Sequence, residues 1–347
     1  MTAIMAGRVV TFGEIMLRLS PPGFERFFQS PVLAATFGGG EANVAVSLAQ
    51  FGLDSHYVTR LPTHAIGDAA VRALRAEGVD TRHVIRGGSR VGIYFAETGA
   101  SQRASTVIYD RAHSAISEMA ADAVDWKAVM QGAAWFHVTG ITPALGEKAA
   151  GATKAAVEAA KRAGAKVSVD LNYRKKLWTE AQAQAVMRPL MRDVDLVIAN
   201  EEDLQAVLGI GVKDTDVTSG ALNVDAYREA AASVTSSLGP ATVAITLRES
   251  LSASDNGWSA ILWDGASGTL HQSQRYAVRL VDRIGGGDSF AAGLIYGLLT
   301  GRGHAAALRF ALAASALKQT VPGDFNRVTV AEVDALAKGD ASGRVQR

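Results

Sequence analysis

The segment DRIGGGDSFAAG, residues 282–293, places three consecutive glycines and an acidic residue at the start of an apolar stretch of helical period. Free backbone N–H groups of Gly285, Gly286 and Gly287 at a helix N-terminus would bind phosphate oxygens, and Asp288 beside them could accept a proton from an attacking hydroxyl. A structural interpretation accounts for the same residues, because glycines make turns and Asp288 could cap the helix. This segment alone leaves both interpretations open.

A second glycine cluster, GGGEAN at 38–43, also leads into a predicted helix. It could be a turn followed by a helix start. Glycine also lets a polyol approach the backbone closely, and Asn43 offers both a donor and an acceptor to sugar hydroxyls. By itself the cluster does not separate a turn from a sugar site.

Three further polar clusters follow apolar runs that are typical of buried strands. They are DLNYRKKLW at 170–178, NEED at 200–203 and TLRES at 246–250. In an open parallel sheet, ligands collect at the carboxyl ends of the strands, where these clusters would lie. Arg174 could clamp a carboxylate or a phosphate with its planar guanidinium, whereas a solvated basic turn accounts better for the two lysines that follow it.

Two chemical interpretations apply to NEED, the second of these clusters. Asn200 would cap a helix whose first turn is acidic, and this interpretation is favoured by the residues alone. The acids that follow it could instead hold hydrated Mg²⁺ near nucleotide phosphates, as that metal prefers. Thr246 and Arg248 end another strand, where they would be available to a polyphosphate.

The composition indicates an ordinary globular protein. Among 347 residues, 35 are basic and 34 acidic, so a net charge of +1 gives no reason to expect nucleic acid or an anionic membrane as partner. The absence of cysteine excludes disulfides and thiolate metal sites and fits a reducing cytoplasm. No signal peptide or long apolar span is recognised, and no Gly-Lys dipeptide exists for a Walker-type loop. We expect a cytoplasmic protein.

Short β-branched runs alternate with Ala- and Leu-rich stretches of helical period, which predicts a mostly parallel sheet flanked by helices, an α/β fold. The predicted strands are 8–19, 55–61, 133–140, 165–172, 194–200 and 241–248. The segments 17–40 and 89–115 show alternation and turn residues instead, and they predict a small β-flap outside the main sheet. Its second segment reads as two strands, 90–97 and 105–111, joined by the polar turn TGASQ.

The order GGGEAN, NYR, NEED, TLRE and GGGD resembles that of the PfkB (ribokinase-like) carbohydrate kinases along nearly the whole chain. The most specific element is VDRIGGGDSFAAGLIYG, which stands where the family has D-T-x-G-A-G-D. DLNYRKKLW, VIYDRAHSAIS and PGDFNR are most similar to the 2-keto-3-deoxygluconate kinases of that family. The resemblance implies a three-layer α-β-α sandwich forming one domain over 1–340, with β-lid segments at about 12–36 and 89–113 and a C-terminal tail at 341–347.

The resemblance also implies roles for particular residues. Asp288 matches the catalytic base that deprotonates the terminal hydroxyl of the sugar, Gly285 to Gly287 match the anion hole, and Arg174 lies between nucleotide and sugar. Positions that match nucleotide contacts are Asn172, Arg174, Asn200, Thr246, Arg248, Gly285 and Gly287. Positions that match sugar contacts are Gly39, Asn43, Tyr94, Tyr109, Arg111, Arg174, Asp288 and Asp324.

Three departures from the family pattern stand out. Gly286 replaces an alanine and Arg283 replaces a threonine in the glycine motif. Asp203 ends the N-x-x-E metal motif with a shorter carboxylate, which would reach a metal through water. The segment TLRESLSASDNGW replaces the Lys- and Gly-rich nucleotide loop, so the adenine contacts are not assigned.

The arginines among the predicted sugar contacts indicate that the substrate is negatively charged. Burying the carboxylate of 2-keto-3-deoxygluconate requires a cationic partner, and Arg111 and Arg174 are suitable. Tyr94 and Tyr109 could line the sugar chain, or they could only pack the flap. We expect transfer of the γ-phosphoryl group of MgATP to the 6-hydroxyl of that acid by a homo-oligomer. The alternatives are a fructokinase or ribokinase acting on a neutral sugar, and a non-catalytic sensor of sugar or nucleotide.

Overall fold

A computed structural model describes residues 7–212, 223–340 and 343 of the chain. The predicted tail at 341–347 therefore lies outside the described residues, apart from residue 343. In the described part, no helix is long and apolar enough to cross a membrane.

The main sheet is built from the apolar runs of the sequence, and it is parallel from β11 to β5. Two antiparallel neighbours, β12 and β13, extend one edge, and β14 also pairs with β12. In sheet order the strands are β13 (Thr269–Gln272), β12 (Asp255–Asp264), β11 (Thr242–Ser250), β10 (Leu196–Ala199), β9 (Lys166–Asp170), β8 (Ala133–Thr139), β1 (Arg8–Phe12), β4 (Ser55–Leu61) and β5 (Val84–Arg86), with β14 (Tyr276–Arg279) off this path.

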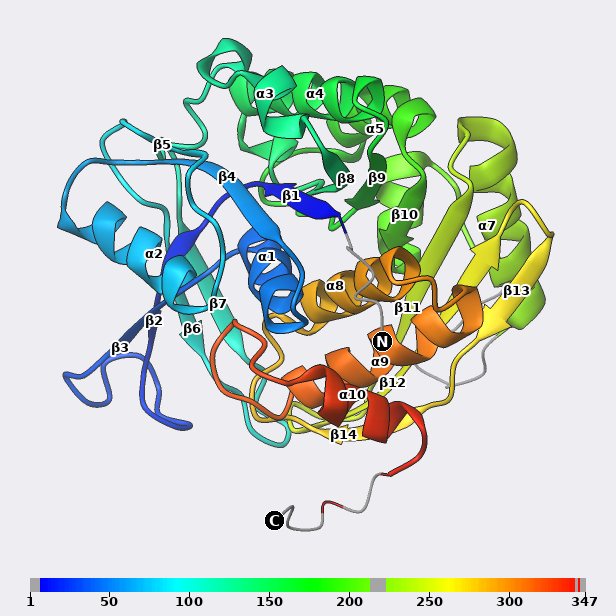
Figure 1. Ribbon diagram of the computed structural model, residues 1–347. Helices are drawn as coiled ribbons and strands as arrows, with labels where there is room; N and C mark the ends of the chain where they lie inside the picture. The colour runs from blue at the N-terminus through cyan, green and yellow to red at the C-terminus, as the bar shows by residue number, and fades with distance from the viewer. Residues whose placement is uncertain (1–6, 213–222, 341–342, 344–347) are drawn as a thin grey trace.

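Helices cover both faces of the sheet, as Figure 1 shows. Alternate side chains of one strand enter different cores: Val9 packs with the helices of one layer, and Val10 with those of the other. One layer contains α1 (Gly40–Gln50), α2 (Ala65–Ala76), α8 (Gly286–Leu299), α9 (His304–Lys318) and α10 (Val330–Ala337). The other contains α3 (Trp126–Met130), α4 (Glu147–Arg162), α5 (Glu180–Leu190) and α7 (Val224–Leu238). The predicted three-layer α/β architecture is confirmed.

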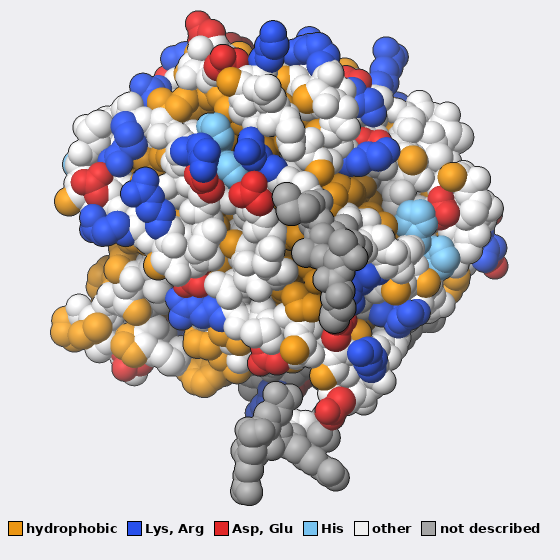
Figure 2. Space-filling view, in the orientation of Figure 1, with side chains coloured by type: hydrophobic (Ala, Val, Ile, Leu, Met, Phe, Trp, Pro, Cys, Tyr) orange, Lys and Arg blue, Asp and Glu red, His pale blue; other side chains and the backbone are white. Residues whose placement is uncertain are grey.

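A separate four-stranded sheet, called here the small sheet, lies beside the carboxyl ends of the main strands. Its order is β3 (Ala34–Gly38), β2 (Met16–Ser20), β6 (Ile93–Glu97) and β7 (Thr106–Asp110). The predicted β-flap is thus confirmed, including the antiparallel pair β6 and β7. Hydrophobic side chains gather at its tip (Figure 2), where Phe24, Phe28 and Val32 are 59%, 74% and 58% exposed.

The prediction of one continuous strand over 8–19 is wrong. The run divides at Gly13, so that β1 belongs to the main sheet and β2 to the small sheet. A side chain at Gly13 would meet the Glu41 carboxylate 2.1 Å away. The chain therefore crosses between the two sheets where only glycine fits, and local alternation alone does not reveal that crossing.

Candidate functional site

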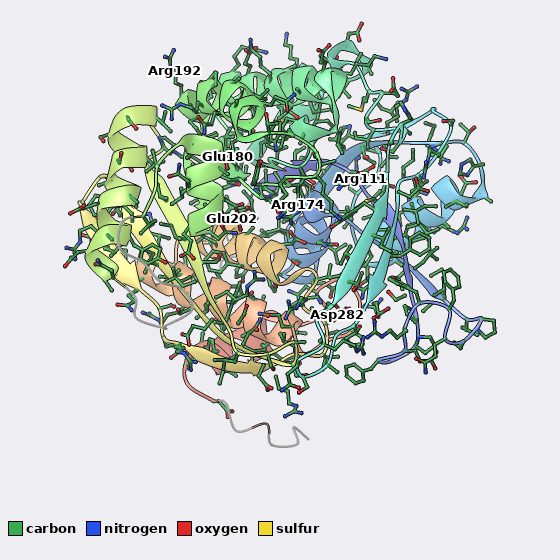
Figure 3. All side chains as sticks on the ribbon, turned by 180° about the vertical axis from the view of Figure 1, so that it is seen from behind. Arg111, Arg174, Glu180, Arg192, Glu202 and Asp282 are labelled. Carbon is green, nitrogen blue, oxygen red and sulfur yellow. The ribbon has the colours of Figure 1, made fainter. Side chains whose placement is uncertain are left out.

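Every predicted site residue lines one pocket of about 730 Å³ between the main and small sheets. The parallel strands bring the clusters at the carboxyl ends of β9, β10 and β11 to the same edge, as expected for an open sheet, although TLRES lies within β11. Figure 3 shows Arg174 on the side of the main sheet and Arg111 beside the small sheet. The predicted residues in this lining are Gly39, Asn43, Tyr94, Tyr109, Arg111, Asn172, Arg174, Asn200, Asp203, Thr246, Arg248, Gly285, Gly286, Gly287, Asp288 and Asp324.

The glycine motif forms the N-terminus of α8. Gly285 precedes the helix with φ 85°, and a side chain there would meet the Asp324 carbonyl oxygen 2.3 Å away. Glycine is required at this position by both its left-handed backbone and this close approach. Gly287 is exposed, and no atom lies within 4 Å of where its Cβ would be, so the first turn of α8 opens toward the pocket.

Asp288 does not cap α8, contrary to the structural interpretation of the sequence. It lies in the first turn of the helix, which has no side-chain cap. Its Oδ2 instead accepts a hydrogen bond of 2.7 Å from Asn43 Nδ2, and Asn43 Oδ1 accepts one of 3.2 Å from the Gly39 N–H. Asn43 is buried, so its amide holds the Asp288 carboxylate toward the pocket. Burial raises the pKa of Asp288 to about 6, and the Asn43 hydrogen bond opposes that shift.

Two more carboxylates lie near Asp288. Burial raises the pKa of Asp203 to about 6, and burial followed by the charges of Asp203 and Asp288 raises that of Asp170. Asp203 also accepts a 2.9 Å hydrogen bond from the Tyr173 N–H and forms a reciprocal cap with Asn200. The cap interpretation of NEED is thereby confirmed. The carboxylates that line the pocket are also the oxygen donors that hydrated Mg²⁺ prefers, and a cation would relieve their mutual repulsion. The residues present fit this metal. Asp170 was not among the residues predicted from the sequence, although it opens the DLNYR cluster.

Three arginines face the pocket and form no ion pair within 4.0 Å in the described part of the chain: Arg174, Arg248 and Arg283. The charge of Arg174 nevertheless opposes the burial that raises the pKa of Asp170, Asp203 and Asp288. Burial, then the charge of Arg248, lowers the pKa of Arg283. An anion bound between these two guanidinium groups would relieve their mutual repulsion, so this part of the pocket is suited to bind an anion. Arg283 was noted in the sequence only as a departure from the family's threonine.

On the side of the small sheet, three of the predicted sugar contacts, Tyr94, Arg111 and Asp324, already form hydrogen bonds with other side chains of the protein. Tyr94 donates to both oxygens of Asp324, at 2.6 and 2.7 Å, and Asp324 is 3% exposed. Arg111 donates from Nε to Glu14 Oε2 at 2.7 Å, so its charge is already compensated. Glu14 Oε1 is buried and accepts no hydrogen bond from the described residues, and it is available to a hydroxyl. Glu14 was not predicted from the sequence, because it lies 97 residues from Arg111.

The hairpin of β11 and β12 supplies the far end of the pocket. Thr246 and Arg248 line it together with Leu251 and Trp258. Leu251 is 65% exposed, and it offers an apolar surface of the kind that a flat heterocycle covers. Thr246 and Arg248 were predicted from the sequence, but Leu251 and Trp258 were not, because TLRESLSASDNGW does not follow the family pattern.

The family model described as pfkB family carbohydrate kinase matches residues 7–329. The chain therefore belongs to the PfkB family and is a carbohydrate kinase, a phosphotransferase with an alcohol group as acceptor, which acts on a sugar and ATP. It is similar to the crystal structure of 2-dehydro-3-deoxygluconokinase from Thermotoga maritima, with a TM-score of 0.92 and 52% identity, covering 96% of this chain and 99% of that one.

Two further relatives are similar to nearly the whole chain. A 2-dehydro-3-deoxygalactonokinase from Haloferax volcanii is 33% identical, covering 98% of this chain and 99% of its own. A 2-dehydro-3-deoxygluconokinase from Thermoproteus tenax is 30% identical, covering 91% of this chain and 89% of its own.

Replacing Asn43 tests its hydrogen bond to Asp288. The bond favours the ionised carboxylate, so Asn43→Ala should raise the pKa of Asp288 above its value of about 6. Carboxyl ¹³C NMR over a pH series measures the shift, with the resonance assigned by its loss in Asp288→Asn. An unchanged or lower pKa would contradict this account of Asn43.

Proposed function

We propose that the protein phosphorylates the 6-hydroxyl of 2-dehydro-3-deoxygluconate with ATP. The observation that carries the proposal is the position of Asp288, a carboxylate with a raised pKa at the mouth of a glycine-lined helix N-terminus in a pocket rich in unpaired arginines. The similarity to 2-dehydro-3-deoxygluconokinases supports the substrate class.

Asp288 serves as the general base in this proposal. It accepts the proton of the 6-hydroxyl while the oxygen forms a bond to the γ-phosphorus and the bond from that phosphorus to ADP breaks. N–H groups at the Gly285–Gly287 turn and Arg174 stabilise the charge on the transferring group. Mg²⁺, held through water by Asp203 and near Asp170, supplies further charge neutralisation when bound. Positioning and electrostatics account for nearly all the catalysis expected of such a site.

We assign the arginines Arg248 and Arg283 to the nucleotide phosphates, together with Thr246, Asn172 and Asn200. The two guanidinium groups line the end of the pocket that the β11–β12 hairpin forms. We place the adenine against Leu251 and Trp258.

The carboxylate of the sugar acid would lie between Arg174 and Arg111. Arg174 is exposed and forms no ion pair within 4.0 Å among the described residues, so its guanidinium can bind a carboxylate that the Arg111–Glu14 pair cannot compensate alone. Arg111 still has an Nη1 group that makes no hydrogen bond to the part of the chain described. The orphan oxygen of Glu14 and the amide of Asn43 face the sugar hydroxyls, and Gly39, Tyr94, Tyr109 and Asp324 shape the wall.

The galactonate-derived epimer is a second candidate, because the Haloferax volcanii relative carries that name. A kinase of neutral sugars remains the alternative, whereas membership of the carbohydrate kinase family leaves the expectation of a non-catalytic sensor without support. The homo-oligomer and the cytoplasmic location also remain predictions; a second copy would cover the exposed apolar tip of the small sheet.

The base assignment is tested by Asp288→Asn. Turnover should fall by at least three orders of magnitude, roughly the size of a lost general base, while the Tm changes little. In the unmodified enzyme, kcat/KM should decrease as the pH falls through about 6, because Asp288 must be ionised to accept the proton. An ADP-release assay measures both, with exposed Asp122→Asn as control. Near-normal turnover of Asp288→Asn would remove the base assignment.

The substrate class is tested by changing both members of the buried pair, Arg111→Met with Glu14→Gln, so that no charge is left buried alone. For 2-dehydro-3-deoxygluconate, kcat/KM should fall about 10- to 150-fold, the range for a lost charged hydrogen bond. Activity on fructose and ribose, if any, should hardly change. A panel that includes the galactonate epimer ranks the substrates. Preference of the unmodified enzyme for a neutral sugar would overturn the sugar-acid assignment.

The phosphate assignment is tested by Arg283→Thr, which restores the family's residue. The KM for ATP should rise about tenfold with the KM for the sugar unchanged, because a charged hydrogen bond contributes about 1.5–3 kcal/mol. Arg279→Thr, on an exposed side chain of β14, is the matched control. An unchanged KM for ATP would mean that Arg283 makes no phosphate contact.

A further inference from the structure

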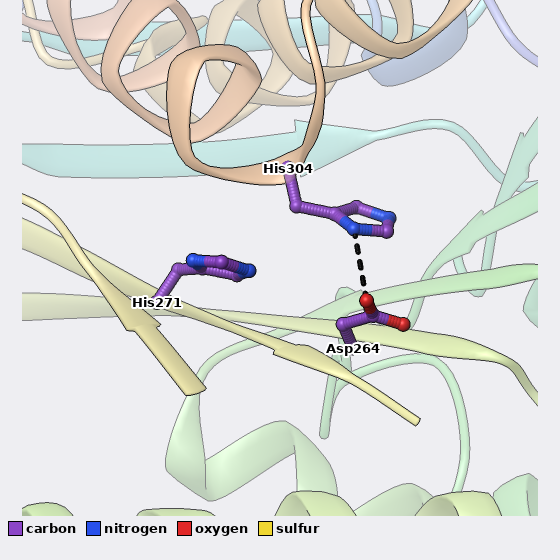
Figure 4. Close-up of side chains that lie close together, drawn as sticks. All are labelled: Asp264, His271 and His304. Atoms are coloured by element: carbon purple, nitrogen blue, oxygen red, sulfur yellow. Dashed lines mark ion pairs between the residues drawn. The ribbon is translucent and has the colours of Figure 1, made fainter. Parts of the chain in front are cut away.

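Asp264, His271 and His304 form a cluster at the edge of the main sheet, and none of them lines the pocket described above. They come from three elements: the end of β12, the middle of β13 and the first residue of α9. Figure 4 shows the three side chains converging where the helix crosses the hairpin of the two strands. Each is partly buried, so each is shielded but accessible to an ion.

The spacing of the three side chains suits a small cation. One ligand atom from each residue lies within 4.8 Å of the other two. His304 Nδ1 and Asp264 Oδ2 are 3.3 Å apart, close to the separation of about 3.4 Å that tetrahedral bonds of 2.0–2.1 Å impose on neighbouring ligands. The two imidazole rings lie 6.0 Å apart between centroids at an interplanar angle of 33°.

The carboxylate is oriented in advance by its own turn. Asp264 Oδ1 accepts a 3.0 Å hydrogen bond from the Ala266 N–H, and Oδ2 accepts one of 2.7 Å from the Ser267 hydroxyl. The Ser267 hydrogen bond, with smaller contributions that include His304, lowers the pKa of Asp264, so the carboxylate is ionised at neutral pH. The backbone of His271 pairs with Leu262 in the sheet, and its imidazole makes no hydrogen bond within the part of the chain described, so the ring is free to act as a ligand. Outer hydrogen bonds of this kind orient metal ligands in proteins.

We propose that Asp264, His271 and His304 bind one divalent transition-metal ion such as Zn²⁺, with water completing the coordination. Two imidazole nitrogens and one carboxylate oxygen favour zinc, cobalt or nickel over Mg²⁺ and Ca²⁺, which prefer oxygen ligands alone. The site is separate from the Mg²⁺ site expected beside the pocket.

A bound ion would fasten α9 to the β12–β13 hairpin. The other end of α9 carries Ser315, whose hydroxyl donates to the Gly286 carbonyl at 2.6 Å, and buried Lys318, which donates to carbonyls around the glycine motif. The metal would therefore stabilise the helix on which the glycine motif rests, without touching the substrates. Its effect should be seen in stability and not in the chemistry.

The test is metal binding by the chelator-treated full chain, with excess Mg²⁺ present to occupy oxygen-only sites. Isothermal titration with Zn²⁺ should show one site per chain, and Zn²⁺ at about 100 times its Kd should raise the Tm by a few degrees. His271→Ala and His304→Ala should each weaken binding at least tenfold and abolish the Tm shift. His64→Ala, an exposed histidine elsewhere, should behave like the unmodified chain.

Kinase activity of each variant at saturating MgATP shows that it is folded, because the cluster takes no part in the reaction. Co²⁺ titration of the unmodified chain gives a measurement that needs no variant: a tetrahedral site of nitrogen and oxygen ligands produces an intense visible absorption, which Zn²⁺ then removes. No Zn²⁺ binding to the unmodified chain, or equal binding by both histidine variants, would overturn the proposal. A missing Co²⁺ band would also overturn it.

Discussion

The arrangement of the pocket depends on one buried cation. Arg18, on β2 of the small sheet, is 2.7 Å from Asp282 and 2.8 Å from Asp324, and it is 5% exposed. Burial opposes its charge, but the two carboxylates outweigh burial, so the pKa of Arg18 is raised. Removing one member of such a cluster leaves a buried charge without compensation, which is strongly unfavourable. Arg18 therefore ties the small sheet to the residue that opens the glycine motif and to the loop after α9.

This tie sets the position of the reacting groups. Asp282 lies three residues before Gly285, whose backbone packs against the Asp324 carbonyl. Asp324 in turn accepts from Tyr94 of β6, so that both halves of the small sheet meet the turn that precedes α8. The same contacts also determine where the charged groups of the pocket lie. Acids with raised pKa values line the pocket with Asp288, and the same pocket contains Arg248 and Arg283, which form no ion pair in the described part of the chain. A metal-bound polyphosphate would neutralise both groups at once.

Much of the fold could be predicted because its signals are local. The strand at 55–61 agrees with β4 residue for residue, and the helix capped by Asn200 starts where the acidic turn indicated. The errors arose where a distant contact decides the outcome. The strand predicted at 8–19 divides because Glu41 packs against Gly13. Asp288 does not cap α8, whose N-cap is Gly285, and its carboxylate instead accepts a hydrogen bond from Asn43. Rules of periodicity and capping consider only residues close in sequence, so they do not detect the contacts made by Glu41 and Asn43.

The sequence by itself determined the class of fold and the order of the polar clusters, because strand ends and helix starts are encoded by nearby residues. Its resemblance to the PfkB family added further pocket residues, but Glu14, Asp170 and Leu251 were found only in the structure. Only the tertiary structure decided which of those residues are free to act. Asn43 and Asp288 are 245 residues apart, and Arg18 and Asp324 are 306 apart. Arg111, expected to be a free cation, is paired with Glu14, whereas Arg283 is left without a partner among the described residues. Whether a charge is compensated depends on what folds against it, and the chain brings those groups together only in three dimensions.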